Sequence, residues 1–202
     1  MGSKREVEIK LSLPSAADGR RLLRQAGFRV IRRRVYEDNL VFDTPQGQLR
    51  SSSLLLRLRI AGSVATLTYK GPPSKSRYKS RFESETRVSD PAACREILNR
   101  LGFQQVYRYE KYRTEYLRED DLGVVALDET PIGVFFELEG SPAWIDATAQ
   151  LMGFGLKSYI VQSYMALHQS CQRRLGLPMR AMVFPLVAPD GDPATPVTPT
   201  AP

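Results

Sequence analysis

The chain has little of the chemistry on which many enzymes depend. Its 202 residues include a single histidine, His168, and two cysteines, Cys94 and Cys171. One histidine argues against a histidine-based metal site and against a Ser-His-Asp triad, because His168 alone would have to supply either. Both cysteines lie in helical patterns without metal-ligand spacing, which is typical of reduced, structural thiols.

Long hydrophobic runs are also missing. No apolar segment approaches the roughly 20 residues needed to cross a bilayer. The first five residues are not followed by the apolar stretch of a signal peptide. The composition, 42% hydrophobic and 25% charged, is ordinary for a globular protein. We therefore expect a cytoplasmic protein with no membrane partner, in which one domain occupies residues 1–180.

Proline is concentrated at the C-terminal end of the sequence. Residues 185–202 combine prolines with Ala, Thr and Asp, and contain few large apolar residues. Such a segment cannot bury enough apolar surface to order itself. We predict that 185–202 is a disordered tail, and the sequence assigns it no further role.

Positive charge is in excess, with a formal net charge of +7. One explanation is a basic outer surface with non-specific affinity for nucleic acid. The other is that many lysines and arginines face inward, toward a polyanionic ligand. The spacing of these residues along the chain distinguishes the two explanations.

Apolar periodicity and turn residues divide the chain into strands and helices, which together predict an α+β fold. Three expected helices end before a Gly-Phe pair, at Gly27, Gly102 and Gly153, where glycine would stop the helix. These pairs leave open whether the chain contains an internal duplication or three ordinary helix ends. The strands are expected at 5–13, 30–42, 54–60, 64–70, 78–88, 107–117, 123–128 and 133–139, and the helices at 14–28, 91–101, 142–152 and 161–175.

Two strand segments alternate acidic with apolar residues. In the first, Glu6 and Glu8 share one face, and in the second, Glu137 and Glu139 do. The opposite faces are wholly apolar and are predicted to be core. A sheet that is apolar outside and acidic inside suggests a barrel with a polar interior. Carboxylates gathered there would repel one another unless cations held them, and Mg²⁺ or Mn²⁺ takes oxygen ligands of this kind.

The same alternation recurs in other strands and places basic residues on the polar face. For any one strand the simplest explanation is a half-exposed antiparallel sheet with a solvated outer face. Over many strands, however, that face concentrates arginine pairs, lysines and carboxylate pairs rather than a usual surface mixture, which favours an enclosed interior. The residues that share polar faces are Arg57 with Arg59, Thr66 with Thr68 and Lys70, Arg81 with Glu83 and Glu85, and Tyr109 with Lys111 and Arg113.

Such a face is suited to phosphoryl transfer. Arginine guanidinium groups bind phosphate oxygens in pairs and lysines bind them as point charges. Carboxylate-held metals bridge phosphate oxygens and neutralise charge that develops in the transition state. The sequence supplies cations for the phosphate and carboxylates for the metal, both at strand spacing.

Several segments of the chain match motifs of one protein family. The segment Glu6-x-Glu8-x-Lys10 resembles the opening signature of the CYTH superfamily, also called the triphosphate tunnel metalloenzymes. The likeness covers roughly residues 5–170. Within it, the loop at 71–73 and the strand that carries Glu83 and Glu85 are most similar to the class IV adenylyl cyclase-like branch. The chain departs from the common pattern at Glu37 and Val41, where many relatives carry Gln and Tyr. Further matching motifs are Phe42-Asp43-Thr44-Pro45, Leu56-Arg57-Leu58-Arg59, Leu67-Thr68-Tyr69-Lys70-Gly71-Pro72, Lys111-x-Arg113, Leu127-Asp128-Glu129 and Gly133-x-Phe135-x-Glu137-x-Glu139-Gly140.

The resemblance implies a closed tunnel of eight antiparallel strands flanked by helices. It implies Mg²⁺ or Mn²⁺ as cofactor and Glu85 as a catalytic residue. Lys10 is a further catalytic candidate, which would accept a proton only if nearby cations lower its pKa. Glu85, with Glu83, would hold a second metal or the attacking water, and Lys157 would lie on the closing segment. The implied metal ligands are Glu6, Glu8, Asp128, Glu137 and Glu139, and the implied triphosphate-binding residues are Lys10, Arg57, Arg59, Lys70, Lys111 and Arg113.

Three functions remain open. The first is a metal-dependent triphosphatase acting on inorganic triphosphate, ATP or thiamine triphosphate. The second is a class IV adenylyl cyclase that converts ATP to cyclic AMP and diphosphate, for which no short motif specifies an adenine pocket. The third is a binding protein for polyphosphate or RNA, which would not need inward carboxylates. We expect no nucleic-acid partner, and the sequence leaves the oligomeric state open, with a homodimer as one alternative.

Overall fold

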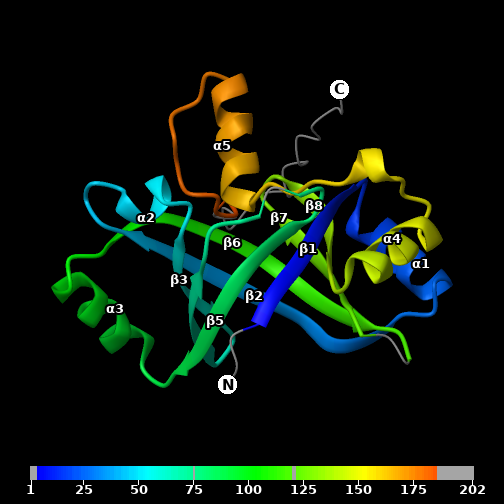
Figure 1. Cartoon of the computed structure of the whole chain (residues 1–202), viewed down its shortest axis with the longest axis horizontal. Helices are drawn as coiled ribbons and strands as arrows, with labels where there is room; N and C mark the ends of the chain where they lie inside the picture. Colours follow the sequence, from blue (N-terminus) through cyan, green and yellow to red (C-terminus); the bar gives the residue numbers. More distant parts are fainter. Residues whose placement is uncertain (1–3, 75, 120–121, 186–202) are drawn as a thin grey trace, which may run out of the picture.

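The computed structural model describes residues 4–74, 76–119 and 122–185. Its strands form one closed antiparallel barrel in the order β1-β5-β4-β3-β2-β6-β7-β8 (Figure 1). The α+β fold with an eight-stranded closed barrel, predicted from the sequence, is confirmed. The strands are β1 (Lys4–Leu13), β2 (Arg29–Asp43), β3 (Leu55–Ala61), β4 (Val64–Lys70), β5 (Lys79–Val88), β6 (Gln104–Leu117), β7 (Val124–Thr130) and β8 (Gly133–Glu139).

Strand β1 closes the ring, because it pairs with β5 along one edge and with β8 along the other. In its register with β8, Glu8 is opposite Glu139 and Lys10 is opposite Glu137. Directly opposed residues of neighbouring antiparallel strands project to the same face of a sheet. The two acidic segments at opposite ends of the sequence are therefore neighbours on the inner wall of the barrel.

The longer of the described helices begin at side-chain caps. Ser15, Asp90, Ser141 and Ser163 each accept a hydrogen bond from a backbone N–H of the first helical turn. Two short elements, α2 (Gln48–Ser51) and η1 (Leu156–Ser158), were not predicted, because elements of so few residues have no periodicity to detect. Among the described residues, no helix is both long and apolar enough to span a membrane. The helices are α1 (Ala16–Gln25), α2 (Gln48–Ser51), α3 (Pro91–Arg100), α4 (Pro142–Leu151), α5 (Tyr164–Arg174) and the 3-10 helix η1 (Leu156–Ser158).

Glycine ends three of these helices, as predicted. Gly27, Gly102 and Gly153 have φ angles of 81°, 89° and 85°, a left-handed conformation that glycine adopts without a steric penalty. The N–H of the phenylalanine after each glycine donates to a carbonyl in the last helical turn, at 2.9–3.0 Å. This pattern satisfies carbonyl groups that the end of a helix leaves without partners.

The hydrophobic core lies outside the barrel, between the strands and the helices. Ile9 and Leu11 of β1 and Phe136 of β8 are fully buried there, against Leu23 of α1 and Ile145 of α4. Figure 1 shows α1 and α4 together against one side of the barrel. Because the apolar faces of these strands point outward to the helices, their charged faces point inward.

The C-terminal part of the described chain covers one end of the barrel. Helix α5 stands over this end (Figure 1), and the chain then returns to β6, where Met182 exchanges backbone hydrogen bonds with Arg108 and Glu110 at 3.0 and 2.8 Å. The N–H of Phe184 donates to the Glu110 carboxylate at 2.9 Å. The chain thus stays bonded to the barrel as far as Phe184. Apart from Pro185, the predicted tail lies outside the described residues.

Candidate active site in the barrel interior

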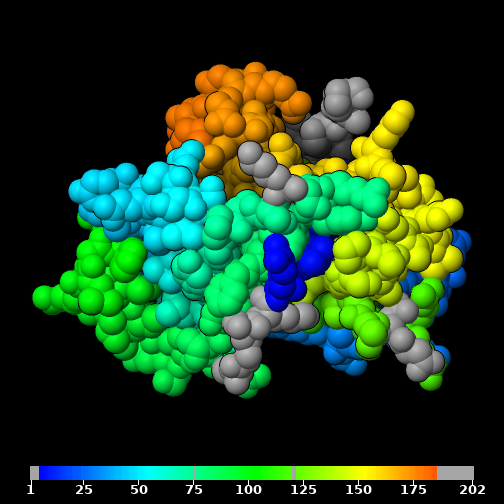
Figure 2. Space-filling view, viewed as in Figure 1, coloured from blue at the N-terminus to red at the C-terminus, as the bar shows by residue number. Residues whose placement is uncertain are grey.

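The barrel encloses a cavity of about 1090 Å³. Every residue predicted for the metal or triphosphate site lines this cavity except Asp128. On the face drawn in Figure 2, most of β1 is hidden behind neighbouring segments, in agreement with the burial of Glu6, Glu8 and Lys10. Lys157 lies on η1, is exposed, and does not line the cavity.

One wall of the cavity, formed by β1, β5 and β8, mixes carboxylates with lysines. The Lys10 ammonium lies between two carboxylates, 3.4 Å from Glu8 Oε1 and 3.0 Å from Glu137 Oε2. Lys79 Nζ also contacts Glu8, and Arg113 donates to Glu137 at 2.7 Å. Each acid in this group is therefore held close to more than one cation.

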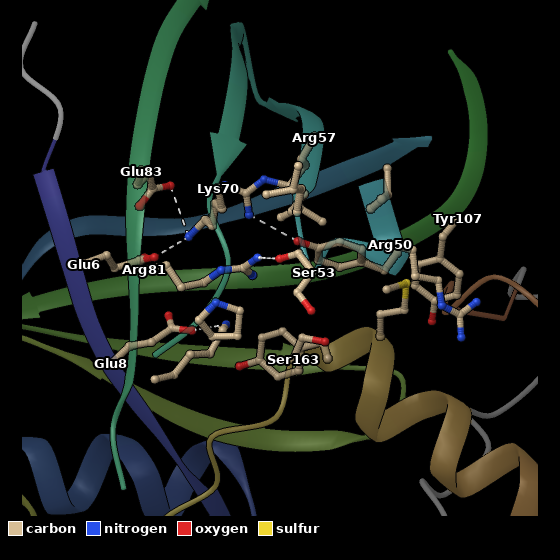
Figure 3. Close-up of a pocket in the computed structure, with 18 of the residues that line it drawn as sticks. Glu6, Glu8, Arg50, Ser53, Arg57, Lys70, Arg81, Glu83, Tyr107 and Ser163 are labelled. Atoms are coloured by element: carbon tan, nitrogen blue, oxygen red, sulfur yellow. Dashed lines mark hydrogen bonds and ion pairs between the residues drawn. The ribbon is translucent and has the colours of Figure 1, made fainter. Parts of the chain in front are cut away.

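A second cluster, beside this wall, is built around Lys70 of β4. Its ammonium contacts Glu6 at 2.5 Å and Glu83 at 3.1 Å, as Figure 3 shows. Nearby, Arg81 donates to the backbone carbonyls of Gly71 and Ser53 at 2.7 and 2.8 Å. Arg81 thereby joins the segment after β4 to the segment before β3, at the edge of the cavity.

The opposite wall, formed by β3, β2 and β6, is rich in cations. Arg57 donates to the hydroxyls of Tyr109 and Thr68 at 3.2 and 3.3 Å. The Thr68 hydroxyl donates to Glu85 at 2.7 Å, and this carboxylate also lies 3.6 Å from Arg59. Glu85 therefore lies beside the two arginines, with one oxygen shared among these groups.

Asp128 of β7 is fully buried behind the cavity lining. Its carboxylate accepts a bidentate pair of hydrogen bonds from Arg113, both at 2.7 Å. It also accepts from Lys111 at 2.9 Å and from the Tyr164 hydroxyl at 2.7 Å. In this arrangement Asp128 orients two predicted triphosphate-binding residues, and its role as a metal ligand stays a prediction.

Burial and neighbouring charge shift the pKa values of the acids in opposite directions in the wall formed by β1, β5 and β8. Burial alone would raise the pKa of Glu8, but Lys10 and Lys79 outweigh this effect and hold that pKa at about 2. Burial likewise raises the pKa of Glu137, and Lys10 with Arg113 lowers it well below the ordinary value. Both side chains are therefore carboxylates at neutral pH.

The charge state of Lys10 bears on its predicted catalytic role. Burial would lower the pKa of Lys10, but Glu137 and Glu8 raise it above the ordinary value. Lys10 is therefore an ammonium ion in this arrangement, which suits an anion-binding role. A role as proton acceptor would require the two carboxylates to be engaged elsewhere, and it stays a prediction.

The donor set fits a hard divalent cation. Carboxylate oxygens from β1 and β8 line one wall, and such oxygens are the preferred ligands of Mg²⁺ and Mn²⁺. As the side chains stand, no three His, Cys, Asp or Glu groups within the described ranges share an ion-sized site. Instead, the ammonium groups of Lys10 and Lys79 supply positive charge beside Glu8. Binding a metal would require these acids to exchange lysine contacts for the ion.

Some residues of this cavity were not predicted as site residues. Lys79 of β5 lies one alternation step before Arg81, so a longer reading of that polar face would have found it. Tyr164 begins a helix, and no strand pattern could have placed it against Asp128. The sequence marked Glu37 only as a departure from the family pattern. In the structure it is buried among the cations of the wall formed by β3, β2 and β6.

Comparisons with known proteins agree with this architecture. The family model described as CYTH domain matches residues 4–150. A protein of Methanocaldococcus jannaschii named "Putative adenylate cyclase" is 32% identical over 136 residues, which cover 67% of this chain and 77% of that protein.

Solved structures share the fold. A structure from Vibrio parahaemolyticus, which carries the same description, has a TM-score of 0.71 at 18% identity and covers 83% of this chain and 99% of its own. A structure from Hippeastrum, described as "Putative adenylyl cyclase", has a TM-score of 0.61 at 24% identity and covers 82% of this chain and 96% of its own. At these identities the two structures establish the fold alone. Together with the family match and the Methanocaldococcus relative, they lead to one conclusion: the chain belongs to the CYTH family.

Proposed function

We propose that this protein hydrolyses triphosphates in the barrel cavity with the help of Mg²⁺ or Mn²⁺. The observation that carries the proposal is the position of Lys10 between Glu8 and Glu137, inside a cavity whose opposite wall holds Arg57, Arg59 and Lys111. Acids suited to a metal and cations suited to phosphate thus line one enclosed space. A simple anion-binding protein would not need the acids of the wall formed by β1, β5 and β8, which repel an anion unless a cation lies beside them.

The basic side chains bind the phosphate chain. Arg57 and Arg59 are adjacent on the inward face of β3, and Lys111 and Arg113 are adjacent on β6. Their guanidinium and ammonium groups donate to phosphate oxygens and fix the chain along the cavity. The acidic partners that now hold them, Asp128 through hydrogen bonds and Glu85 through ion pairs, keep them oriented before substrate arrives.

The residues that would hold the metal are Glu6, Glu8, Glu137 and Glu139. When bound, the metal supplies positive charge that neutralises phosphate oxygens during the reaction. Glu85, beside Arg57 and Arg59, orients a water molecule toward the terminal phosphorus. The water oxygen forms a new bond to phosphorus, the bridging P–O bond breaks, and orthophosphate and diphosphate leave with one proton released to solvent.

The Hippeastrum relative supports hydrolysis, because its structure is described as revealing a dominant triphosphatase activity. Cyclisation of ATP is a second candidate, favoured by the name of the Methanocaldococcus relative at 32% identity. In that reaction the ribose 3′-hydroxyl would attack the α-phosphorus and diphosphate would leave.

One experiment separates these functions. In the presence of Mg²⁺ or Mn²⁺, the purified protein is incubated in separate reactions with inorganic triphosphate and with ATP. Orthophosphate released from inorganic triphosphate supports the triphosphatase. Cyclic AMP and diphosphate formed from ATP support the cyclase. Absence of turnover with either substrate and either metal overturns both and leaves a binding function.

A further inference from the structure

Glu37 lies in the middle of the cationic wall, on the strand opposite β1 in the barrel. Its register partner on β6 is Lys111, and Asn39, the next residue on the same face of β2, is paired with Arg59 on β3 and Tyr109 on β6. All three of these partners line the cavity. Glu37 and Asn39 are themselves fully buried beside these partners and do not line the cavity.

Glu37 meets its neighbours through charge and not through hydrogen bonds. Its carboxylate oxygens lie 4.0 Å from Arg59 Nη1 and 3.6 Å from Lys111 Nζ. Neither oxygen has a hydrogen-bond partner, and neither amide atom of Asn39 has one. Most buried polar groups in proteins are hydrogen-bonded. A fully buried carboxylate without such bonds is retained here by the cations around it.

The carboxylate is ionised at neutral pH. Burial alone would raise the pKa of Glu37, but Lys111, Arg113 and Arg59 lower it to about 2. Each of the two nearest cations also keeps another acidic partner, since Lys111 contacts Asp128 at 2.9 Å and Arg59 lies 3.6 Å from Glu85. The position of these cations therefore does not depend on Glu37 alone, whereas removal of the Glu37 charge makes the net charge of the wall more positive by one unit.

We propose that Glu37 is a specificity-determining residue that offsets positive charge in the wall and so limits how tightly the cavity retains short phosphate anions. This inference rests on the proposed function, in which phosphate chains bind to this wall. A negative charge beside Arg59 and Lys111 opposes any anion that these residues contact. Diphosphate, which makes fewer contacts than a triphosphate, is then released readily after hydrolysis.

The test compares three variants for binding of inorganic pyrophosphate. Isothermal titration calorimetry in metal-free buffer gives the Kd for each. Glu37→Gln keeps the shape and removes the charge, so we expect pyrophosphate to bind about tenfold more tightly. Asn39→Asp adds a charge to the same face, so we expect binding about tenfold weaker. The double variant Glu37→Gln/Asn39→Asp moves the charge by two residues and is expected to have a Kd close to that of the wild type.

A matched control is Glu129→Gln, which removes one negative charge from the partner of Arg34 on the outer face of the barrel. We expect its Kd for pyrophosphate to be unchanged. Circular dichroism and thermal unfolding verify that each variant is folded. If Glu37→Gln does not fold, Asn39→Asp tests the same prediction with the opposite sign.

The kinetic consequence is a second readout. If the protein releases diphosphate slowly in Glu37→Gln, this variant shows a lower KM, a lower kcat and stronger inhibition by added pyrophosphate than the wild type. A structural defect would instead lower kcat without strengthening pyrophosphate binding.

Two outcomes would overturn the inference, and they differ in meaning. If the wild type binds and hydrolyses triphosphate but the folded variants keep the wild-type Kd, or both shift it in the same direction, Glu37 does not set anion retention and the proposed function stands. If the wild type binds neither pyrophosphate nor triphosphate and does not hydrolyse triphosphate, the proposed function fails and this inference fails with it.

Discussion

Glu8 of β1 and Glu139 of β8 are directly opposed in the antiparallel register, and both line the barrel cavity. The Cβ atoms of such a pair lie about 4.5–5.5 Å apart, so the two carboxylates repel each other unless positive charge lies close by. Lys10 and Lys79 supply that charge at Glu8 in the present structure. In a metal-dependent enzyme a divalent ion would take over this role, and removal of the acids is the most direct test.

Glu137→Gln is expected to abolish metal-dependent hydrolysis while the protein stays folded. The change preserves the shape of a side chain that contacts Lys10 and Arg113 but removes the charge that a metal needs. We expect a loss of at least about 100-fold in kcat/KM, measured as orthophosphate release. Glu129→Gln is the control with the same charge change outside the cavity. Full activity of Glu137→Gln would remove this residue from the metal site.

Arg57→Ala is expected to weaken substrate binding more than it slows the chemical step. Arg57 lies buried in the wall formed by β3, β2 and β6 and donates hydrogen bonds to the hydroxyls of Tyr109 and Thr68. Loss of a guanidinium group that binds phosphate oxygens should raise KM by about 10–100-fold, with kcat changed far less. Arg34→Ala removes an arginine on the outer face and should leave KM as it is. An unchanged KM in Arg57→Ala would exclude Arg57 from substrate binding.

Glu83 is expected to make the stability of the protein depend on pH near neutrality. Burial raises the pKa of Glu83 to about 7; Lys70 opposes the rise and Glu6 adds to it. In the unfolded chain a glutamate titrates near 4.3, about the ordinary value. Between these two values the folded protein binds a proton that the unfolded chain does not, so the free energy of unfolding falls as pH rises.

Glu83→Gln removes this loss. The Tm of Glu83→Gln minus the Tm of the wild type should therefore increase by about 3–6 °C as the pH rises from about 5 to about 8. Thermal unfolding of both proteins across a pH series measures this difference. Glu96→Gln, on the exposed face of α3, should show no such trend. A constant Tm difference between Glu83→Gln and the wild type at every pH would show that Glu83 does not titrate in this range.

Tyr164→Phe tests how firmly α5 is joined to the barrel. The Tyr164 hydroxyl donates to Asp128 at 2.7 Å in a fully buried contact. Its removal deprives a buried carboxylate of one donor and should cost about 1–2 kcal/mol, which lowers Tm by about 2–8 °C. Tyr36→Phe, at a partly exposed ring, is the comparison. A Tm equal to the wild type in Tyr164→Phe would mean that water replaces the hydroxyl without loss.

The inner faces of the strands could be predicted wherever charged and apolar residues alternate without interruption. The side chains of Glu6 and Glu8, or of Arg57 and Arg59, must lie on one face because the repeat of a strand is two residues. Apolar partners on the other face then decide which face is inward. The inward charged faces of β1, β3, β4, β5, β6 and β8 follow from this alternation.

The same reasoning failed where the pattern is mixed or where the residue lies outside a strand. On β2, Glu37 and Asn39 share an inward face with Val35 and Val41, so no run of charge marks that face. Tyr164 reaches Asp128 from the first turn of a helix, and its contact depends on how α5 returns over the barrel. The two shortest helical elements contain too few residues for any periodicity to appear.

The double pairing of β1 has a consequence for how the protein is made. Strand β1 leaves the ribosome before both of its neighbours, β5 and β8, so one of its edges stays open until Glu139 has emerged. Contacts between such distant parts of a chain form slowly, and an open edge can pair with another nascent chain. We therefore expect newly synthesised molecules to be most prone to aggregation in the interval before the last strand arrives, and to lose that tendency once the seam has closed.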